Sequence, residues 1–139
     1  MKADAKTERE VMDTLGAFIR AYRDRDLDRI LGLFAPDPDV VFYGNGEDEK
    51  SIGLSGIKEQ AEHDWSQSAA VSLQIKWVSV SMAAPVAWLS ADLEILAEGG
   101  GVEMSLPARL TAVLERRGEK WLFMQLHVSL PTREEGENK

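Results

Sequence analysis

The spacing of apolar residues changes from a helical to a strand period near the middle of the chain. In the first half, apolar side chains recur every three to four positions, which predicts three helices. A long helix begins at Thr7, a short one begins at Asp26, and a third covers residues 55–65. Between the second and third helices, residues 39–43 are rich in β-formers and predict a short strand. The first half is therefore expected to be mainly helical.

From Val71 onward, apolar and polar residues alternate. This pattern predicts four antiparallel strands at about 71–82, 87–95, 102–115 and 121–130. In the first strand the apolar parity slips after Trp77, as a β-bulge would require. Each strand has one strongly apolar face, which the helices must cover. The sequence therefore predicts an α+β domain with a bent antiparallel sheet around helices, enclosing either a cavity or a filled core.

Length and composition limit the classes of function. The 139 residues, 44% of them hydrophobic, suit one globular domain, expected over 7–131 with disordered ends at 1–6 and 132–139. A net charge of −8 disfavours phosphate backbones and anionic lipid, so we expect no nucleic acid and no membrane as partners. No cysteine and no metal-spaced histidine pair is present, so we expect no metal and no cofactor. Without an apolar leader pattern, a cytoplasmic protein is expected.

Several local motifs carry a resemblance to a known family. Ala21-Tyr-Arg-Asp-Arg-Asp-Leu-Asp28 after a long helix, and Gly53-Leu-Ser-Gly-Ile57 before the third, resemble nuclear-transport-factor-2-like (NTF2-like) domains. The ending Arg109–Trp121, with His127 after it, is similar to the SnoaL-like and ketosteroid-isomerase-like branch. The resemblance covers residues 7–131 and implies a cone-shaped, cystatin-like fold. It also implies a pocket between the helices and the concave sheet face, and a dimer through the convex face.

Asp64 is the candidate for acid–base chemistry. It falls on the apolar side of the third helix, where burial disfavours its charged form and raises its pKa, as a general acid or base requires. The alternative is a structural aspartate that accepts a hydrogen bond from a nearby amide or arginine. Tyr22 and Tyr43 are candidates to polarise an oxygen of a substrate. His63 is expected in solvent and His127 on the outward face, so neither is a predicted base.

Two sets of residues follow from the parity of the strands and helices. The predicted pocket lining is apolar and aromatic: Phe18, Phe42, Trp65, Leu89, Ala91, Leu110, Met124 and Leu126. The opposite face carries an unusual number of large aromatic residues, which favours a homodimer interface. Its predicted members are Trp88, Asp92, Arg109, Trp121, Phe123, Gln125 and His127.

Two functions of different kinds fit these expectations. The first is a protein that binds a small, largely apolar metabolite, with cofactor-free isomerase, cyclase or dehydratase chemistry at Asp64. The second is a non-catalytic dimeric association module whose core is filled. A cavity that reaches solvent near Asp64 would favour the first function. Both depend on Gln125 and His127 facing outward while Met124 and Leu126 face the helices.

Overall fold

The structure is a computed structural model that describes residues 1–67 and 70–132. The helices are α1 (Ala5–Asp24), α2 (Leu27–Gly32) and α3 (Gly53–Gln67). The strands are β1 (Val41–Tyr43), β2 (Lys50–Ile52), β3 (Ala70–Ala83), β4 (Val86–Gly99), β5 (Val102–Arg117) and β6 (Lys120–Ser129). The predicted α+β class and the order of elements are confirmed, except that β2 was not expected.

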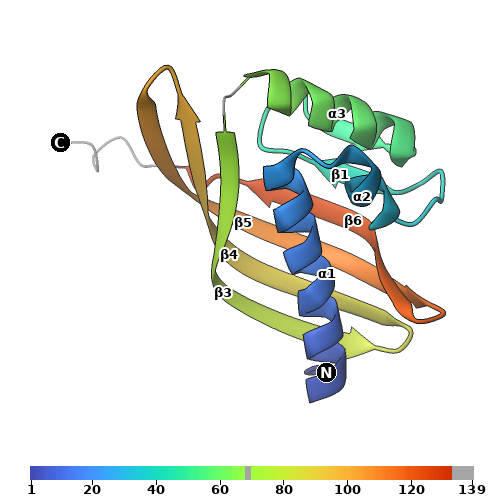
Figure 1. Ribbon diagram of the computed structural model, residues 1–139. Coiled ribbons are helices and arrows are strands. Elements are labelled where there is room, and N and C mark those ends of the chain that lie inside the picture. Colours follow the sequence, from blue (N-terminus) through green and yellow to red (C-terminus); the bar gives the residue numbers. More distant parts are fainter. Residues whose placement is uncertain (68–69, 133–139) are drawn as a thin grey trace.

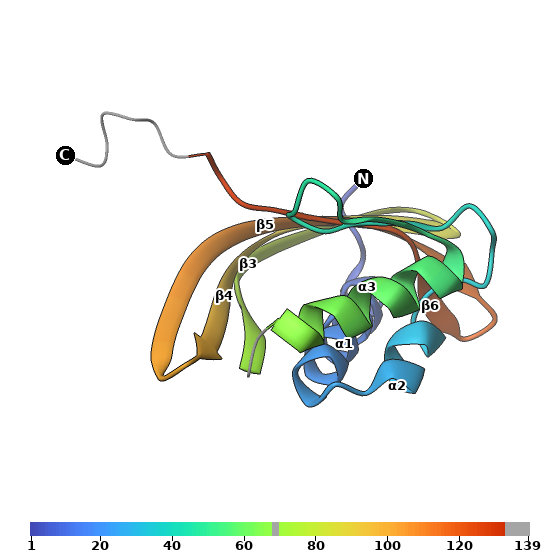
Figure 2. The same cartoon turned by 90° about the horizontal axis from the view of Figure 1, so that it is seen from above.

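The strands form one strongly bent sheet in the order β2-β1-β6-β5-β4-β3. All neighbours are antiparallel except β1 and β6, which pair in parallel. Figures 1 and 2 show α1 lying across the concave face, with α2 and α3 at one end of it. The predicted meander is therefore extended by two short strands. These strands, β1 and β2, lead directly into α3 and place it at the rim of the concave face.

The N-terminal segment of the chain is part of the fold. Residues 1–6 were expected to be disordered, and this prediction is wrong. The Met1 carbonyl accepts a hydrogen bond from the Met82 amide, and the Ala3 amide donates to the Val80 carbonyl, so this segment lies along β3. Asp4 then caps α1 by accepting from the Thr7 amide at 2.7 Å, so the helix begins at Ala5 and not at Thr7 as expected. At the other end, the tail predicted at 132–139 lies outside the described residues except for Thr132.

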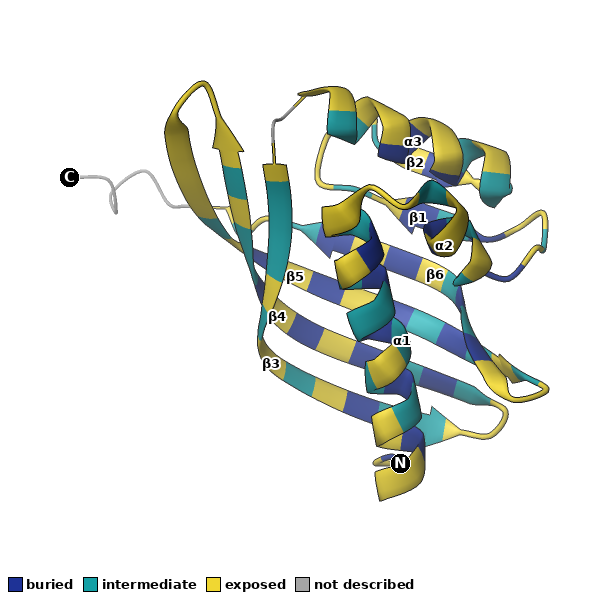
Figure 3. Ribbon diagram, viewed as in Figure 1, coloured by how far each residue is buried: buried dark blue, intermediate teal, exposed yellow. Residues whose placement is uncertain are grey.

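The concave face of the sheet and α1 enclose the core, seen as the dark stripe of buried positions in Figure 3. Alternate residues of β4 and β5 are almost fully buried, among them Leu89 and Leu110 at 1% exposure each. The four phenylalanines of the chain meet at the centre of this core, with ring centroids 5.3–6.2 Å apart in the contacts between them. Burial of each such side chain stabilises the fold by about 2–3 kcal/mol.

A β-bulge in β6 changes which residues face the core. Leu114 pairs with Phe123 and Val113 with Gln125, so Met124 is an extra residue. After the bulge, Leu126 faces the core and is buried. Before the bulge, the residues that face the core are those of the opposite alternation.

Trp121 and Phe123 are therefore core residues, with exposures of 5% and 0%. Their predicted place on an outward dimer interface is wrong, because the expectation assumed an unbroken alternation along β6. The Trp121 indole donates to the Glu10 carboxylate at 3.1 Å, which ties β6 to α1.

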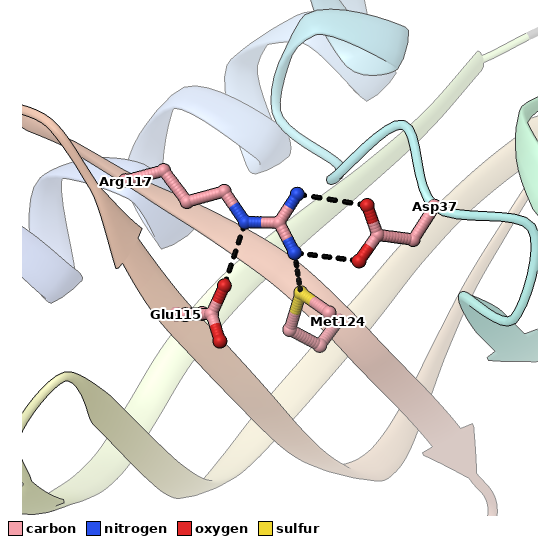
Figure 4. Close-up of polar contacts among 4 residues, drawn as sticks. All are labelled: Asp37, Glu115, Arg117 and Met124. Carbon is pink, nitrogen blue, oxygen red and sulfur yellow. Dashed lines mark hydrogen bonds and ion pairs between the residues drawn. The ribbon is translucent and has the colours of Figure 1, made fainter.

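An arginine beside this bulge joins the β5–β6 hairpin to the segment that follows α2 (Figure 4). Arg117 donates two hydrogen bonds to the Asp37 carboxylate, at 2.8 and 2.5 Å, and one to Glu115 at 2.6 Å. It also contacts the Met124 sulfur at 3.8 Å. The bidentate pair holds the pKa of Asp37 below its usual range. This contact fixes the connection from which β1 starts.

Candidate active site

A cavity of about 250 Å³ opens between α3, the C-terminal part of α1 and the outer part of the sheet. Its polar lining comes mainly from α3 and the β1–β2 loop, and its apolar lining from α1 and the strands. The lining residues are Phe18, Tyr22, Phe42, Gly44, Asn45, Glu49, Gln60, His63, Asp64, Gln67, Val71, Leu73, Ile95, Leu106 and Val128.

Two predicted residues meet on the wall of this cavity. The Tyr22 hydroxyl donates a hydrogen bond of 2.6 Å to Asp64 Oδ2, although the two residues are 42 positions apart. The helices that carry them are held together beside this bond: the Trp65 indole donates to the Tyr22 carbonyl at 3.1 Å. Arg25, in the left-handed position that ends α1, donates to the Trp65 carbonyl at 2.8 Å. The geometry of the tyrosine–aspartate pair is therefore fixed by backbone contacts.

The surroundings of Asp64 raise its pKa to about 6. The largest cause is partial burial, which disfavours the charged carboxylate. The hydrogen bond from Tyr22 acts in the opposite direction, whereas the neighbouring Glu49 carboxyl, in hydrogen-bonding contact, raises the pKa further. The pKa of Tyr22 is also raised, chiefly by burial and then by its bond to Asp64. Near neutral pH, Asp64 can therefore both release and accept a proton.

Glu49 reaches the cavity because of the short β1–β2 connection. Gly44 donates its amide hydrogen to the Glu49 carbonyl at 2.8 Å, which closes the loop. The Gly46 amide donates to Glu49 Oε2 at 2.6 Å, which directs the side chain. Nothing in the acidic sequence around Glu49 indicated that this residue reaches a cavity. Strand β2 pairs with β1 and turns the residue back toward α3.

Of the other predicted catalytic and pocket residues, Phe18 and Phe42 line the cavity. Trp65 does not line it, but its ring packs against that of Tyr22, with centroids 5.8 Å apart. Tyr43 lies on the opposite face of the sheet, 39% exposed and 5.3 Å from the His127 ring, because β1 alternates like any strand. The prediction that Tyr43 reaches the pocket is therefore wrong.

The remaining predicted pocket residues lie elsewhere. Leu89, Ala91, Leu110 and Leu126 are buried in the core and do not line the cavity. Met124 is the bulge residue and contacts Arg117. Among the described residues, these side chains fill the inner part of the cone, and the cavity of about 250 Å³ opens beside α3.

Sequence reasoning missed several polar residues of the cavity, namely Glu49, Gln60, His63 and Asn45. Gln60 is 8% exposed, and its Oε1 accepts from the buried Ser51 hydroxyl at 2.6 Å. One feature of the sequence could have identified Gln60 as a cavity residue: Gln60 and Asp64 are four residues apart and therefore share one face of α3. His63 is exposed at the edge of the cavity, as expected, but its charge acts on Asp64.

The part of the chain that the structure describes shows neither a metal-binding cluster nor a membrane-spanning helix. Within 1–67 and 70–132, no group of three or more His, Asp or Glu side chains is arranged to hold a metal ion. No helix in those ranges is long and apolar enough to cross a membrane. Gln125 and His127 are exposed on the outer face together with Asp92 and Arg109, which confirms the predicted orientation of these four residues.

The comparisons with known proteins agree on the fold. A candidate dehydratase of the NTF2-like family from Streptomyces avermitilis superposes with a TM-score of 0.87 at 16% identity, covering 94% of this chain and 100% of that one. A Nostoc punctiforme protein with a cystatin-like fold gives 0.79 at 14% identity, with 94% and 96% covered. A type 2 hexachlorocyclohexane dehydrochlorinase gives 0.80 at 15% identity, with 91% and 86% covered.

No curated protein matches the sequence significantly. The SnoaL-like domain family, in contrast, matches residues 11–133, which is most of the chain. Together with the bent sheet and its helical cover, this match identifies the fold as NTF2-like, and the chain belongs to the SnoaL-like domain family.

Proposed function

We propose that this protein binds a small, largely apolar organic molecule and moves a proton on it without a cofactor. The observation that carries the proposal is the 2.6 Å hydrogen bond from Tyr22 to Asp64, an aspartate with a pKa of about 6, on the wall of a cavity. A general base works best when its pKa lies near the operating pH. Asp64 is the proposed base, and Tyr22 and Glu49 keep it in position and tune it.

The cavity favours a neutral substrate of modest size. Its volume of about 250 Å³ is just below the range of roughly 300–1,000 Å³ usual for drug-sized ligands. No Lys or Arg is among the described residues that line it, while two carboxyl groups are. An anionic ligand would therefore be repelled. Phe18, Phe42 and the aliphatic strand residues offer an apolar surface to a ring or a short chain.

Proton transfer also agrees with the names of two structural neighbours. One is described as a candidate dehydratase and the other as a dehydrochlorinase. Elimination of water or of hydrogen chloride begins with removal of a proton, for which a base of suitable pKa is needed. Identities of 16% and 15% show a shared fold, and the reaction class is carried over to this chain by the present proposal.

The test is proton exchange on weak carbon acids that fit the cavity. Cyclohexanone, 2-tetralone and nitrocyclohexane are incubated with the protein in D₂O, and loss of the acidic C–H signal is followed by NMR. We expect wild-type protein to accelerate exchange of at least one probe, and Asp64→Asn to lower that rate by roughly 10²-fold or more.

Asp13→Asn is the matched control, since Asp13 is exposed on α1 and does not line the cavity. It should exchange the probes as fast as wild type. Equal rates for wild type, Asp64→Asn and the control would contradict the catalytic proposal.

We also propose that the chain forms a homodimer through the outer face of the sheet. With Trp121 and Phe123 in the core, support comes from other side chains of that face: Trp77 is 54% exposed and Ile52 54%, and the Tyr43 ring packs at a tilt against that of His127. Sedimentation equilibrium should give twice the 15.4 kDa chain mass. A single-chain mass at micromolar concentration would exclude this dimer.

A further inference from the structure

One buried donor beside the proposed base has no acceptor. Within residues 1–67 and 70–132, Gln60 Nε2 is the buried side-chain nitrogen or oxygen that lacks a hydrogen-bond partner. The rest of its amide is well anchored, because Oε1 accepts from Ser51 at 2.6 Å and both residues are more than nine-tenths buried. An unsatisfied buried donor costs about 1–3 kcal/mol, so its presence in a folded protein calls for an explanation, such as a role in catalysis or a bound water, ion or ligand.

The position of this nitrogen places it on the cavity wall. A Cβ atom added at Gly44 would collide with Gln60 Nε2 and would lie 2.6 Å from Glu49 Oε2. The amide nitrogen therefore points toward Gly44 and Glu49, and all three residues line the cavity. A glycine at 44 keeps open the space in front of the donor. Asp64 lies on the same face of α3, one turn further on.

We propose that Gln60 is a substrate-binding residue whose amide donates a hydrogen bond to an oxygen of the ligand. This inference rests on the proposed function and narrows its substrate class to neutral molecules with a carbonyl, hydroxyl or nitro oxygen. The oxygen takes the place in front of Nε2, and the adjacent carbon faces Asp64. Withdrawal of electron density by the hydrogen bond acidifies the C–H that Asp64 removes, and the negative charge that develops on the oxygen strengthens the bond.

Two other acceptors could satisfy Nε2, and the experiment separates them. One is an internal water molecule, and the other is a Glu49 carboxylate that turns toward Gln60. In both cases the donor would be occupied whether or not a ligand is present. Removing Gln60 would then change the affinity for ligands with and without an oxygen equally.

The test compares cyclohexanone with methylenecyclohexane, which has nearly the same shape but no acceptor. The side-chain amide signals of ¹⁵N-labelled protein are recorded during titration with each probe. We expect the Gln60 amide to shift with cyclohexanone and to stay unchanged with methylenecyclohexane. The chain has four glutamines, so these signals can be assigned on the wild-type protein without a variant.

Affinities give the second readout. Gln60→Met should lower the ketone-to-alkene affinity ratio by roughly fivefold, whereas Gln74→Met, at an exposed position of β3 that does not line the cavity, should leave the ratio unchanged. The role of Gln60 is refuted if the ketone-to-alkene affinity ratio is the same in all three proteins. It is also refuted if the NMR signal of the Gln60 amide does not shift while both probes bind beside Tyr22 and Asp64. In either case the proposed pocket stands. If neither probe binds, the proposed function fails and this inference fails with it.

Discussion

The pH dependence of stability that Asp64 contributes should run opposite to that of an aspartate whose pKa is lowered by an ion pair, such as Asp37. The pKa of Asp64 is about 6 in the folded protein, whereas an aspartate in an unfolded chain has a pKa of about 3.9. Between these values the folded state holds a proton that the unfolded state has released. The free energy of unfolding contributed by Asp64 is therefore highest below pH 4, falls as the pH rises to 6, and stays low above it.

Asp64→Asn removes this dependence, because asparagine cannot ionise and its Oδ1 can still accept from Tyr22. A difference of about two pKa units corresponds to about 3 kcal/mol as an upper bound. Asp64 is only partly buried, so screening by solvent reduces the expected gain to about 1 kcal/mol. For a chain of this length, that gain raises the melting temperature by roughly 3 °C. The variant should thus be more stable than wild type at pH 8 and no more stable at pH 4.

Urea denaturation at several pH values between 4 and 8 measures this directly. The difference in the free energy of unfolding between Asp64→Asn and wild type should grow with pH and level off above 6. Asp13→Asn, at an exposed position of α1, should show no such trend. If the difference between Asp64→Asn and wild type is constant across this pH range, Asp64 does not have a raised pKa, and the reasoning from burial and Glu49 is refuted.

Three further predictions concern the tuning of the base, the core and the cavity. Tyr22→Phe removes a hydrogen bond that lowers the pKa of Asp64, so the midpoint of its titration, followed by ¹³C NMR, should rise above 6; an unchanged midpoint would show that the bond does not form. Phe123→Ala should destabilise the protein by about 3–5 kcal/mol in urea, against less than about 0.5 kcal/mol for Gln74→Ala at an exposed position of β3. Similar values for the two would mean that Phe123 is not in the core. Gly44→Ala should weaken cyclohexanone binding at least tenfold by calorimetry, because its Cβ meets Glu49 and the Gln60 amide; full affinity would show that the loop yields easily.

The sequence predicted those parts of the fold that follow from local periodicity. The alternation in β4 and β5 correctly separated buried Leu89 and Leu110 from exposed Asp92 and Arg109. The parity slip near Trp77 corresponds to a bulge between Ile75 and Trp77. In each case the residues that decide the structure are neighbours in the sequence.

The wrong predictions concern side chains whose face of the sheet is determined by pairing between segments that are distant in the sequence. In β6 both parities are apolar before the bulge, so alternation alone could not show that Trp121 and Phe123 face the core. The Phe123 backbone exchanges hydrogen bonds with Leu33 and Ala35, a contact that no local pattern reveals. Tyr43 was similarly assigned to the wrong face, since the pairing of β1 with β6 fixes its direction.

The same distinction holds for the candidate site. Asp64 and Tyr22 could be selected because each lies on the apolar face of a helix, and the structure brings them into contact. Glu49 could not, because an acidic turn between two short strands looks like any exposed loop in the sequence. The free donor of Gln60 could not be predicted either. Only the structure shows that the Ser51 hydroxyl donates to Gln60 Oε1 and that Gln60 Nε2 has no partner.

Apart from Tyr22, every polar side chain that the described residues contribute to the cavity wall belongs to a single stretch of the chain, residues 44–67, whereas the hydrocarbon surface comes from elements spread over the rest of it. Redesign of the cavity-facing positions in that one cassette thus offers a new selectivity, as long as its core residue Ile57 is kept. Homologues of this architecture are expected to diverge fastest there, and chimaeras that exchange this cassette offer a direct route to new reactions.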